Sequence, residues 1–120
     1  MDLEDLIGPL PAPLGRWMLR RLVAGAVRYG HEFAILLVRG AGTNELAAVL
    51  RGADIFSSWD GGDYLALLPD TDRAGALRVA DRVRHDTGAN VGSAHWGGDL
   101  AEDLLERAMQ ALEADIAQRA

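Results

Sequence analysis

The sequence contains no cysteine and no lysine, and each absence excludes a class of chemistry. Without cysteine there are no disulfides, no thiolate zinc sites and no cysteine nucleophile. All 12 basic residues are arginine, so there is no P-loop lysine and no lysine for a Schiff base. Reactions that depend on a thiol or an amine side chain are therefore excluded.

Long apolar runs and an excess of positive charge are also missing. No run approaches the roughly 20 apolar residues of a membrane-spanning helix, so no membrane partner is expected. The net charge is −6, which argues against broad binding to nucleic acid or an anionic membrane, although a local arginine cluster can still hold a small anion. The acidic start, MDLEDL, is unlike a signal peptide, and a cytoplasmic location is expected.

What is present fits one globular domain. The chain has 120 residues, of which 49% are hydrophobic and 25% charged, enough for a real core. Residues 1–13 are predicted to be a lead-in segment, because glycine and three prolines interrupt regular structure there. Residues 14–120 are predicted to form a single domain.

Hydrophobic periodicity predicts an alternation of helices and strands. Helices are expected at 14–28, from Thr43 or Asn44 to about 50, from 70–72 to Gly88, and from about 100 onward; strands are expected at 32–38, on both sides of 60–63, and at 90–96. This order, β-α-β-β-α-β with flanking N- and C-terminal helices, predicts an α+β, ferredoxin-like (palm) fold with an antiparallel sheet. Such a fold hosts many functions and decides none.

The stretch RGADIFSSWDGGDYLALLP, residues 51–69, predicts a β-hairpin. Ile55, Phe56 and Trp59 favour a strand, and a second short apolar run begins at Tyr64. Between the runs, glycine supplies the positive φ that a tight turn needs. A hairpin therefore explains the stretch without any function, and the alternative is a vestigial nucleotide site.

Three segments together resemble the GGDEF domains, best known as diguanylate cyclases that build cyclic di-GMP from two GTP. RRLVAGAVRYGHEFAILLV resembles the first helix and strand of that family. DIFSSWDGGDYLALLPDTDRAGALRVADRVR resembles its signature hairpin and the next helix, and VGSAHW with DLAEDLLERAMQAL is similar to its late strand and final helix. The resemblance covers nearly the whole chain, with a gap, and rests on the order and spacing of the segments.

Counting back from the Leu-Pro end at Pro69 sets the register of the signature. Its five letters then fall on Asp60, Gly61, Gly62, Asp63 and Tyr64. In the first position a carboxylate replaces glycine and would repel the phosphates of GTP. Asp63 takes the fourth, catalytic acidic position of the family, although an acidic residue in a turn is also common for structural reasons.

Two further departures concern the metal and the guanine base. The family's metal-binding aspartate corresponds to Arg39, or to Val38 or Gly40 one residue either way, and a guanidinium would exclude magnesium, which needs oxygen ligands. Only 20 residues, 40–59, separate Arg39 from the signature. This segment is shorter than the family's guanine-binding segment, and Asn44 lies too early to serve in it. The resemblance therefore implies a shortened, degenerate domain that is not an enzyme and holds no metal or cofactor.

One ligand site of the family does have a counterpart. Many GGDEF domains carry an inhibitory Arg-x-x-Asp site for cyclic di-GMP five residues before the signature, and Arg51 and Asp54 have that spacing. Arginine can fork onto guanine O6 and N7, and aspartate can accept from its N1–H and N2–H₂. Arg78 and Arg82 are candidates for a second arginine. Alternatively, Asp54 ends a loop and Arg51 complements a helix dipole.

Three functions follow, in decreasing order of support. The first is a catalytically inactive regulatory domain that binds cyclic di-GMP and signals by protein association. The second is a protein-interaction or dimerisation module that binds no nucleotide. The third, residual turnover of GTP, conflicts with Arg39 and Asp60. The expected partners are thus cyclic di-GMP and a protein partner or a second copy of the chain, with no nucleic acid.

Overall fold

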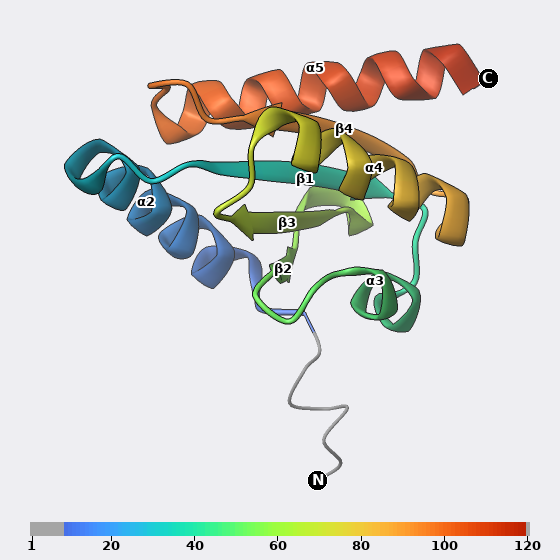
Figure 1. Cartoon of the computed structure of the whole chain (residues 1–120). Coiled ribbons are helices and arrows are strands. Elements are labelled where there is room, and N and C mark those ends of the chain that lie inside the picture. The colour runs from blue at the N-terminus through green and yellow to red at the C-terminus, as the bar shows by residue number, and fades with distance from the viewer. Residues whose placement is uncertain (1–8, 120) are drawn as a thin grey trace, which may run out of the picture.

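The computed structural model describes residues 9–119 and shows a four-stranded antiparallel sheet with helices on both faces (Figure 1). Its elements are α2 (Ala12–Tyr29), β1 (Phe33–Arg39), α3 (Thr43–Val49), β2 (Ile55–Ser58), the 3₁₀ turn η1 (Asp60–Gly62), β3 (Tyr64–Pro69), α4 (Arg73–Thr87), β4 (Asn90–His95) and α5 (Ala101–Arg119). The strand order is β2-β3-β1-β4. The ferredoxin-like α+β fold predicted from the sequence is confirmed.

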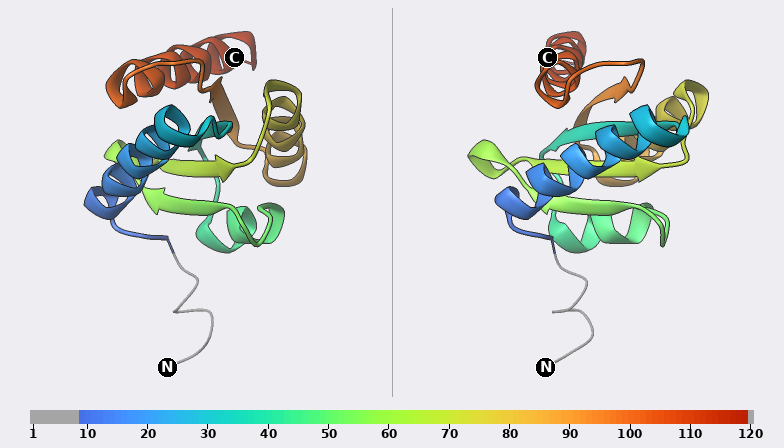
Figure 2. Two further views of the ribbon diagram at one scale, coloured as in Figure 1. Left: turned by 60° about the vertical axis from the view of Figure 1, so that its left-hand side comes forward. Right: turned by 90° about the vertical axis from the view of Figure 1, so that its left-hand side faces the viewer.

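The central strand β1 supplies both halves of the core. Successive side chains of a strand point to opposite faces, so Ile35 packs with α2 and α5, whereas Leu36 packs with α3 and α4. Both side chains are fully buried. Figure 2 shows these two helical layers on either side of the sheet. A strand covered on both faces explains the unbroken apolar run in the sequence.

Helix α2 begins at Ala12, two residues before the predicted start. Pro13 is tolerated because the first turn of a helix has no partner for its N–H groups, so a proline there loses no hydrogen bond. The predicted glycine ends are confirmed: Gly30 and Gly88 adopt left-handed conformations with φ of 72° and 75°. None of the helices between residues 9 and 119 has the length and apolar character needed to cross a membrane.

Part of the predicted lead-in segment pairs with the sheet. Leu10 forms a parallel bridge with Ser57 on the edge strand β2. The Leu10 N–H donates to the Phe56 carbonyl at 3.0 Å, and its carbonyl accepts from the Ser58 N–H at 2.8 Å. Residues 1–8 of the lead-in lie outside the described residues. The folded part of the chain thus begins before residue 14.

At the opposite edge, Asp115 ties α5 to β4. Its carboxylate accepts from the Val91 N–H at 2.8 Å and from Nε of Arg84 at 3.0 Å. Burial is the largest single influence and would raise the pKa of Asp115, but the hydrogen bonds from Val91 and Arg84, with the charges of Arg84 and Arg119, together lower it. The carboxylate is therefore held in its charged form.

We expect Asp115→Asn to cost about 2 kcal/mol of unfolding free energy at pH 7, because it weakens hydrogen bonds to a charged acceptor. A folded pKa below that of the unfolded chain contributes stability above about pH 4, and this contribution is lost as the pH falls through the folded pKa. The difference in unfolding free energy between wild type and Asp115→Asn, measured by urea unfolding, should therefore be far smaller at pH 3 than at pH 7. Asp81→Asn is the control, because the Asp81 side chain also contacts Arg84 but is 76% exposed; a similar loss from both variants would contradict this account.

Candidate functional site

The first three predicted signature residues, Asp60–Gly62, form the 3₁₀ turn η1, Asp63 follows the turn, and Tyr64 begins β3. The Trp59 N–H donates to the Asp63 carbonyl at 2.8 Å and closes the hairpin. Gly61 and Gly62 have φ of 67° and 85°, a region that L-residues with a side chain rarely adopt. The prediction that glycine supplies positive φ in this turn is confirmed.

A bidentate ion pair joins Arg39 to Asp63 behind this turn. Nε and an Nη of Arg39 donate to the two carboxylate oxygens of Asp63, each at 2.9 Å. The pair forms because Val38 lies opposite Tyr64 in the antiparallel β1–β3 register. Arg39, which follows Val38, is therefore brought opposite Asp63, which precedes Tyr64. Asp63 is 3% exposed, whereas the Arg39 side chain is 48% exposed. Hydrogen bonding to Asp63 raises the pKa of Arg39, which stays a cation.

The residues at this point do not fit a divalent cation. Both oxygens of Asp63 already accept from Arg39, and a cation brought to them would face the guanidinium charge. Magnesium takes carboxylate, carbonyl or water oxygens in a near-octahedral arrangement. Within residues 9–119 no three His, Cys, Asp or Glu side chains gather closely enough to hold a metal ion.

The other signature residues anchor the turn to its neighbours. Asp60 is 81% exposed, and its carboxylate lies 3.7 Å from an Nη of Arg16. The Arg16 guanidinium also lies 4.2 Å from the centre of the Trp59 ring, within cation–π range. The Tyr64 hydroxyl lies 2.8 Å from that of Thr43 at the start of α3. The charge of Asp60 is therefore exposed to solvent on this turn, with the Arg16 guanidinium beside it.

Arg51 and Asp54 are directly bonded to each other. Nε and an Nη of Arg51 donate to the two oxygens of Asp54 at 3.2 and 3.1 Å, and the Arg51 N–H donates at 3.0 Å. The same Nη donates to the Thr71 hydroxyl at 2.8 Å, which itself donates to the Pro69 carbonyl. The Asp54 side chain is completely buried and that of Arg51 is 48% exposed. Asp54 therefore fixes the orientation of a half-exposed guanidinium.

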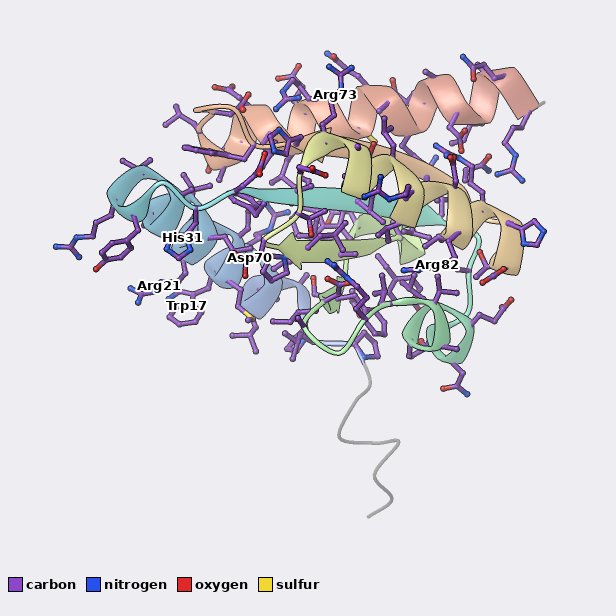
Figure 3. All side chains as sticks on the ribbon, viewed as in Figure 1. Trp17, Arg21, His31, Asp70, Arg73 and Arg82 are labelled. Carbon is purple, nitrogen blue, oxygen red and sulfur yellow. The ribbon has the colours of Figure 1, made fainter. Side chains whose placement is uncertain are left out.

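A pocket of about 290 Å³ opens beside this guanidinium. Arg51 and Thr71 line one part of it, and Arg78 lines another from α4. Arg82, the other predicted arginine, is not among the lining residues; in Figure 3 it lies toward α3, well apart from Asp70 in this pocket. Of the four predicted ligand residues, Arg51 and Arg78 line the pocket, and Asp54 is bonded to Arg51 without lining it.

Five of the lining residues were not predicted from the sequence to belong to a site: Glu32, Asp70, Thr71, Asp72 and Gly75. The segment Asp70-Thr71-Asp72 indicates a helix start, and Asp72 does cap α4 by accepting from the Gly75 N–H at 2.6 Å. Asp70, however, is exposed in the pocket with a φ of 49°, the one positive φ outside glycine among residues 9–119. Aspartate tolerates this left-handed region better than most residues, and the conformation of Asp70 is seen only in the coordinates.

A second, apolar groove runs along α2. It has a volume of about 300 Å³, and we call it the α2 groove; it is lined by Trp17, Met18, Arg21, Leu22, Ile55, Leu67 and Pro69. Trp17 is 56% exposed at its rim, and Figure 3 shows it beside Arg21 on the outer side of α2. Trp59, by contrast, is buried in the core. The core part of the prediction for the tryptophans is confirmed at Trp59, and an interface role for Trp17 stays a prediction.

Solved structures with the same fold are GGDEF domains. That of PA1120 (YfiN or TpbB) from Pseudomonas aeruginosa gives a TM-score of 0.80 at 22% identity, covering 91% of each chain. The diguanylate cyclase SiaD from the same organism, solved with its activator SiaC, gives 0.78 at 20% identity over 88% of this chain. The GGDEF domain of DgcB from Caulobacter crescentus, in complex with c-di-GMP, gives 0.72 at 13% identity, covering 84% of this chain and 81% of that one.

These comparisons establish the fold as that of a GGDEF-like domain. They do not establish an activity, because fold similarity at such low identity does not transfer one. The chain spans 54% of the length of the SiaD chain. No family profile matches the sequence, and no curated protein matches it either. What this domain does must therefore be argued from its own residues.

Proposed function

We propose that this GGDEF-fold domain is a catalytically inactive regulatory module that binds cyclic di-GMP at the Arg51 pocket. The observation that carries the proposal is the Arg51 guanidinium, held at the pocket by buried Asp54 and by Thr71. Such a fixed guanidinium loses little conformational entropy when a ligand binds. A cytoplasmic location belongs to the same proposal.

The pocket is lined by two arginines, Arg51 and Arg78, and by three carboxylates, Glu32, Asp70 and Asp72. This mixture of donors and acceptors suits a guanine base. Nε and one Nη of Arg51 already donate to Asp54 and Thr71, so its other Nη is the group left to donate to the O6 or N7 acceptor of guanine. Asp70 offers a carboxylate acceptor for the N1–H and N2–H₂ donors, a part that the sequence analysis gave to Asp54. Because both oxygens of Asp54 already bond Arg51, Asp54 acts as a positioning residue. Arg78, exposed on α4, supplies the charge for a phosphate or stacks on the base.

The absence of cyclase activity rests on the Arg39–Asp63 pair. The fourth signature position, which is acidic in the enzymes that this chain resembles, is buried and neutralised by an internal cation. Exposed Asp60 adds a repulsive charge at the open side of the turn. Helix α3 has 7 residues, so the segment before the signature offers little chain to bind the guanine base of GTP. These features together support a binding role over turnover.

The test is isothermal titration of the purified chain with cyclic di-GMP, with GTP and magnesium in parallel. We expect binding by the wild type and a loss of about tenfold or more in Arg78→Ala, because a charged hydrogen bond contributes about 1.5–3 kcal/mol. Arg78 is exposed and has no ion pair among the described residues, so this variant should fold normally. Arg51→Lys keeps the charge but loses the bidentate pair with Asp54 that orients it, and should also weaken binding.

Arg28→Ala is the matched control, because Arg28 is exposed and forms no ion pair within residues 9–119; its guanidinium lies 5.8 Å from the centre of the Tyr29 ring. Equal affinities for wild type, Arg78→Ala and Arg51→Lys would refute the assigned site. No binding by the wild type at high ligand concentration would refute the receptor function. Any magnesium-dependent product from GTP would refute the absence of catalysis.

A nucleotide-independent interaction module is the second candidate, and the α2 groove favours it. Trp17 and Leu14 are 56% and 39% exposed one turn apart on α2, and large exposed apolar side chains next to a groove mark contact surfaces. If the domain associates with itself there, sedimentation should show a dimer that Trp17→Ser dissociates. A wild-type monomer at all concentrations would rule out self-association through this groove.

A further inference from the structure

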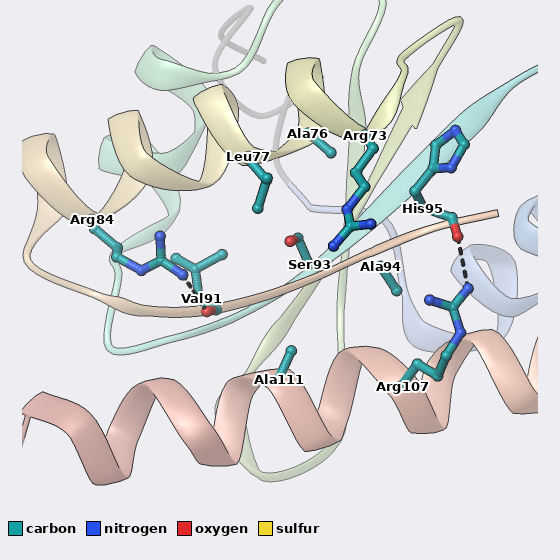
Figure 4. Close-up of a pocket in the computed structure, with 10 residues that line it drawn as sticks. All are labelled: Arg73, Ala76, Leu77, Arg84, Val91, Ser93, Ala94, His95, Arg107 and Ala111. Carbon is teal, nitrogen blue, oxygen red and sulfur yellow. Dashed lines mark hydrogen bonds between the residues drawn. The ribbon is translucent and has the colours of Figure 1, made fainter. Parts of the chain in front are cut away.

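A third pocket, distinct from the Arg51 pocket and the α2 groove, lies over the edge strand β4 between α4 and α5 (Figure 4). Its volume is about 480 Å³, within the range of pockets that take small molecules. The charged lining comes from Arg73, Arg84 and Arg107, with His95 at one end, and no carboxylate is among the lining residues. This is unexpected on a chain with a net charge of −6.

The outer edge of β4 has one open position at the floor of this pocket. The Trp96 N–H donates to the Phe33 carbonyl, so by the alternation of antiparallel pairing the backbone groups of residues 91, 93 and 95 face outward. Val91 is closed off by Asp115 on its N–H and by Arg84 on its carbonyl. The carbonyl of His95 accepts from Arg107 at 2.7 Å.

Ser93 lies between Val91 and His95, whose outward backbone groups accept hydrogen bonds from, or donate them to, side chains of α4 and α5. Among residues 9–119 no partner is present for its outward N–H and carbonyl, because β4 is the last strand of the sheet. Its hydroxyl lies on the α4 side of the strand, toward the pocket (Figure 4). The floor of the pocket therefore offers two donors, the Ser93 N–H and hydroxyl, and one acceptor, the Ser93 carbonyl.

Arg73 is the available cation of this pocket. Arg84 is neutralised by Asp115 and Asp81, and Arg107 by Asp99. No carboxylate of residues 9–119 lies within ion-pair distance of Arg73, whose guanidinium extends from α4 toward the strand in Figure 4. Arg107 adds its remaining Nη from the α5 side, since its other nitrogens bond Asp99 and His95.

We propose that this pocket binds the phosphoryl group of a phosphorylated small molecule. The donors reach the pocket from three directions: Arg73 from α4, Arg107 from α5, and Ser93 from the sheet. A tetrahedral phosphoryl group presents acceptor oxygens in several directions, whereas a planar carboxylate presents only two, so the phosphoryl group matches this arrangement better. Leu77, 48% exposed on the α4 wall, provides apolar contact for the remainder of the ligand.

The test is titration of the full chain with inorganic pyrophosphate, followed by calorimetry and by amide chemical shifts in NMR. We expect the amide of Ser93 to shift and Arg73→Gln to weaken binding by about tenfold or more, the effect of a lost charged hydrogen bond. Arg28→Gln makes the same change of net charge on α2, away from the pocket, and should bind as the wild type does. Amide shifts at Ser93 and its neighbours on β4, rather than around Arg51, separate this site from the cyclic di-GMP pocket.

Three outcomes would overturn the proposal. The first is no pyrophosphate binding by the wild type, and the second is equal binding by wild type and Arg73→Gln. The third is citrate binding as tightly as pyrophosphate, because that would show recognition of negative charge rather than of a phosphoryl group. Because Arg73 has no ion pair among the described residues, the loss of its charge should leave the fold intact, which circular dichroism checks.

Discussion

Replacing Gly92 by alanine is expected to destabilise the domain by about 3 kcal/mol, the upper part of the usual range for overpacking. Gly92 lies in β4 under α5, and an added Cβ would lie 2.7 Å from the Leu112 Cα and closer still to the Leu112 nitrogen and the Ala108 carbonyl oxygen. All three are backbone atoms, so no side-chain rotation can relieve the clash. Helix α5 would have to move off the sheet and lose part of its packing against β1 and β4.

Urea unfolding followed by circular dichroism measures this effect. Gly25→Ala is the matched control, because Gly25 lies in α2 with no atom within 4 Å of an added Cβ. Alanine there should stabilise the domain by up to about 1 kcal/mol through its higher helix propensity. Two glycine-to-alanine changes should thus have effects of opposite sign. A Gly92→Ala domain as stable as the wild type would show that α5 is not seated on β4 in this way.

Arg39→Ala is expected to cost about 3 kcal/mol, because it leaves the buried Asp63 carboxylate without its partner. The penalty falls at the lower end for a broken buried pair, since the Arg39 side chain is 48% exposed and water can partly replace it. Unfolding free energies from denaturant titration at neutral pH give the value. The hairpin turn should lose order first, because Asp63 also accepts the Trp59 N–H through its carbonyl.

A double-mutant cycle with Asp63→Asn separates this pair from other effects. Asparagine removes the charge, so the double variant should be more stable than Arg39→Ala alone. Arg20→Ala provides the exposed comparison: Arg20 and Glu102 are 67% and 71% exposed at 3.8 Å, and such pairs contribute about 1 kcal/mol at most. Additive effects of the two changes at Arg39 and Asp63 would mean that the ion pair does not stabilise the hairpin.

The sequence predicted the fold because its patterns are local. The apolar run before Arg39 specified a buried strand, and glycines at 30 and 88 specified helix ends with left-handed backbone. The Asp-Gly-Gly turn specified a hairpin. Each of these follows from the side chains and backbone freedom of adjacent residues, which a single sequence contains. The start of α2 was misplaced because proline was taken to exclude helix, although the first turn accepts it.

The candidate sites were predicted less well because they depend on contacts between distant residues. Arg39 and Asp63 are 24 positions apart, and only the register of β1 and β3 brings them together. Likewise, Asp54 was expected to face a ligand but is buried against Arg51. Arg82 was placed with Arg78 because both follow the hairpin on one helix, yet it lies outside that pocket. Sequence spacing supplied candidates, and tertiary packing selected among them.

Neither edge of the sheet offers a continuous template for another β-strand. At the β2 edge, Leu10 already occupies the Phe56 carbonyl and the Ser58 N–H. At the β4 edge, charged side chains from α4 and α5 close the positions on both sides of Ser93. Growth of cross-β aggregates needs long runs of open backbone groups. The folded domain should therefore resist amyloid-like self-assembly, and fibre formation should require prior opening of α5 or of the segment before α2.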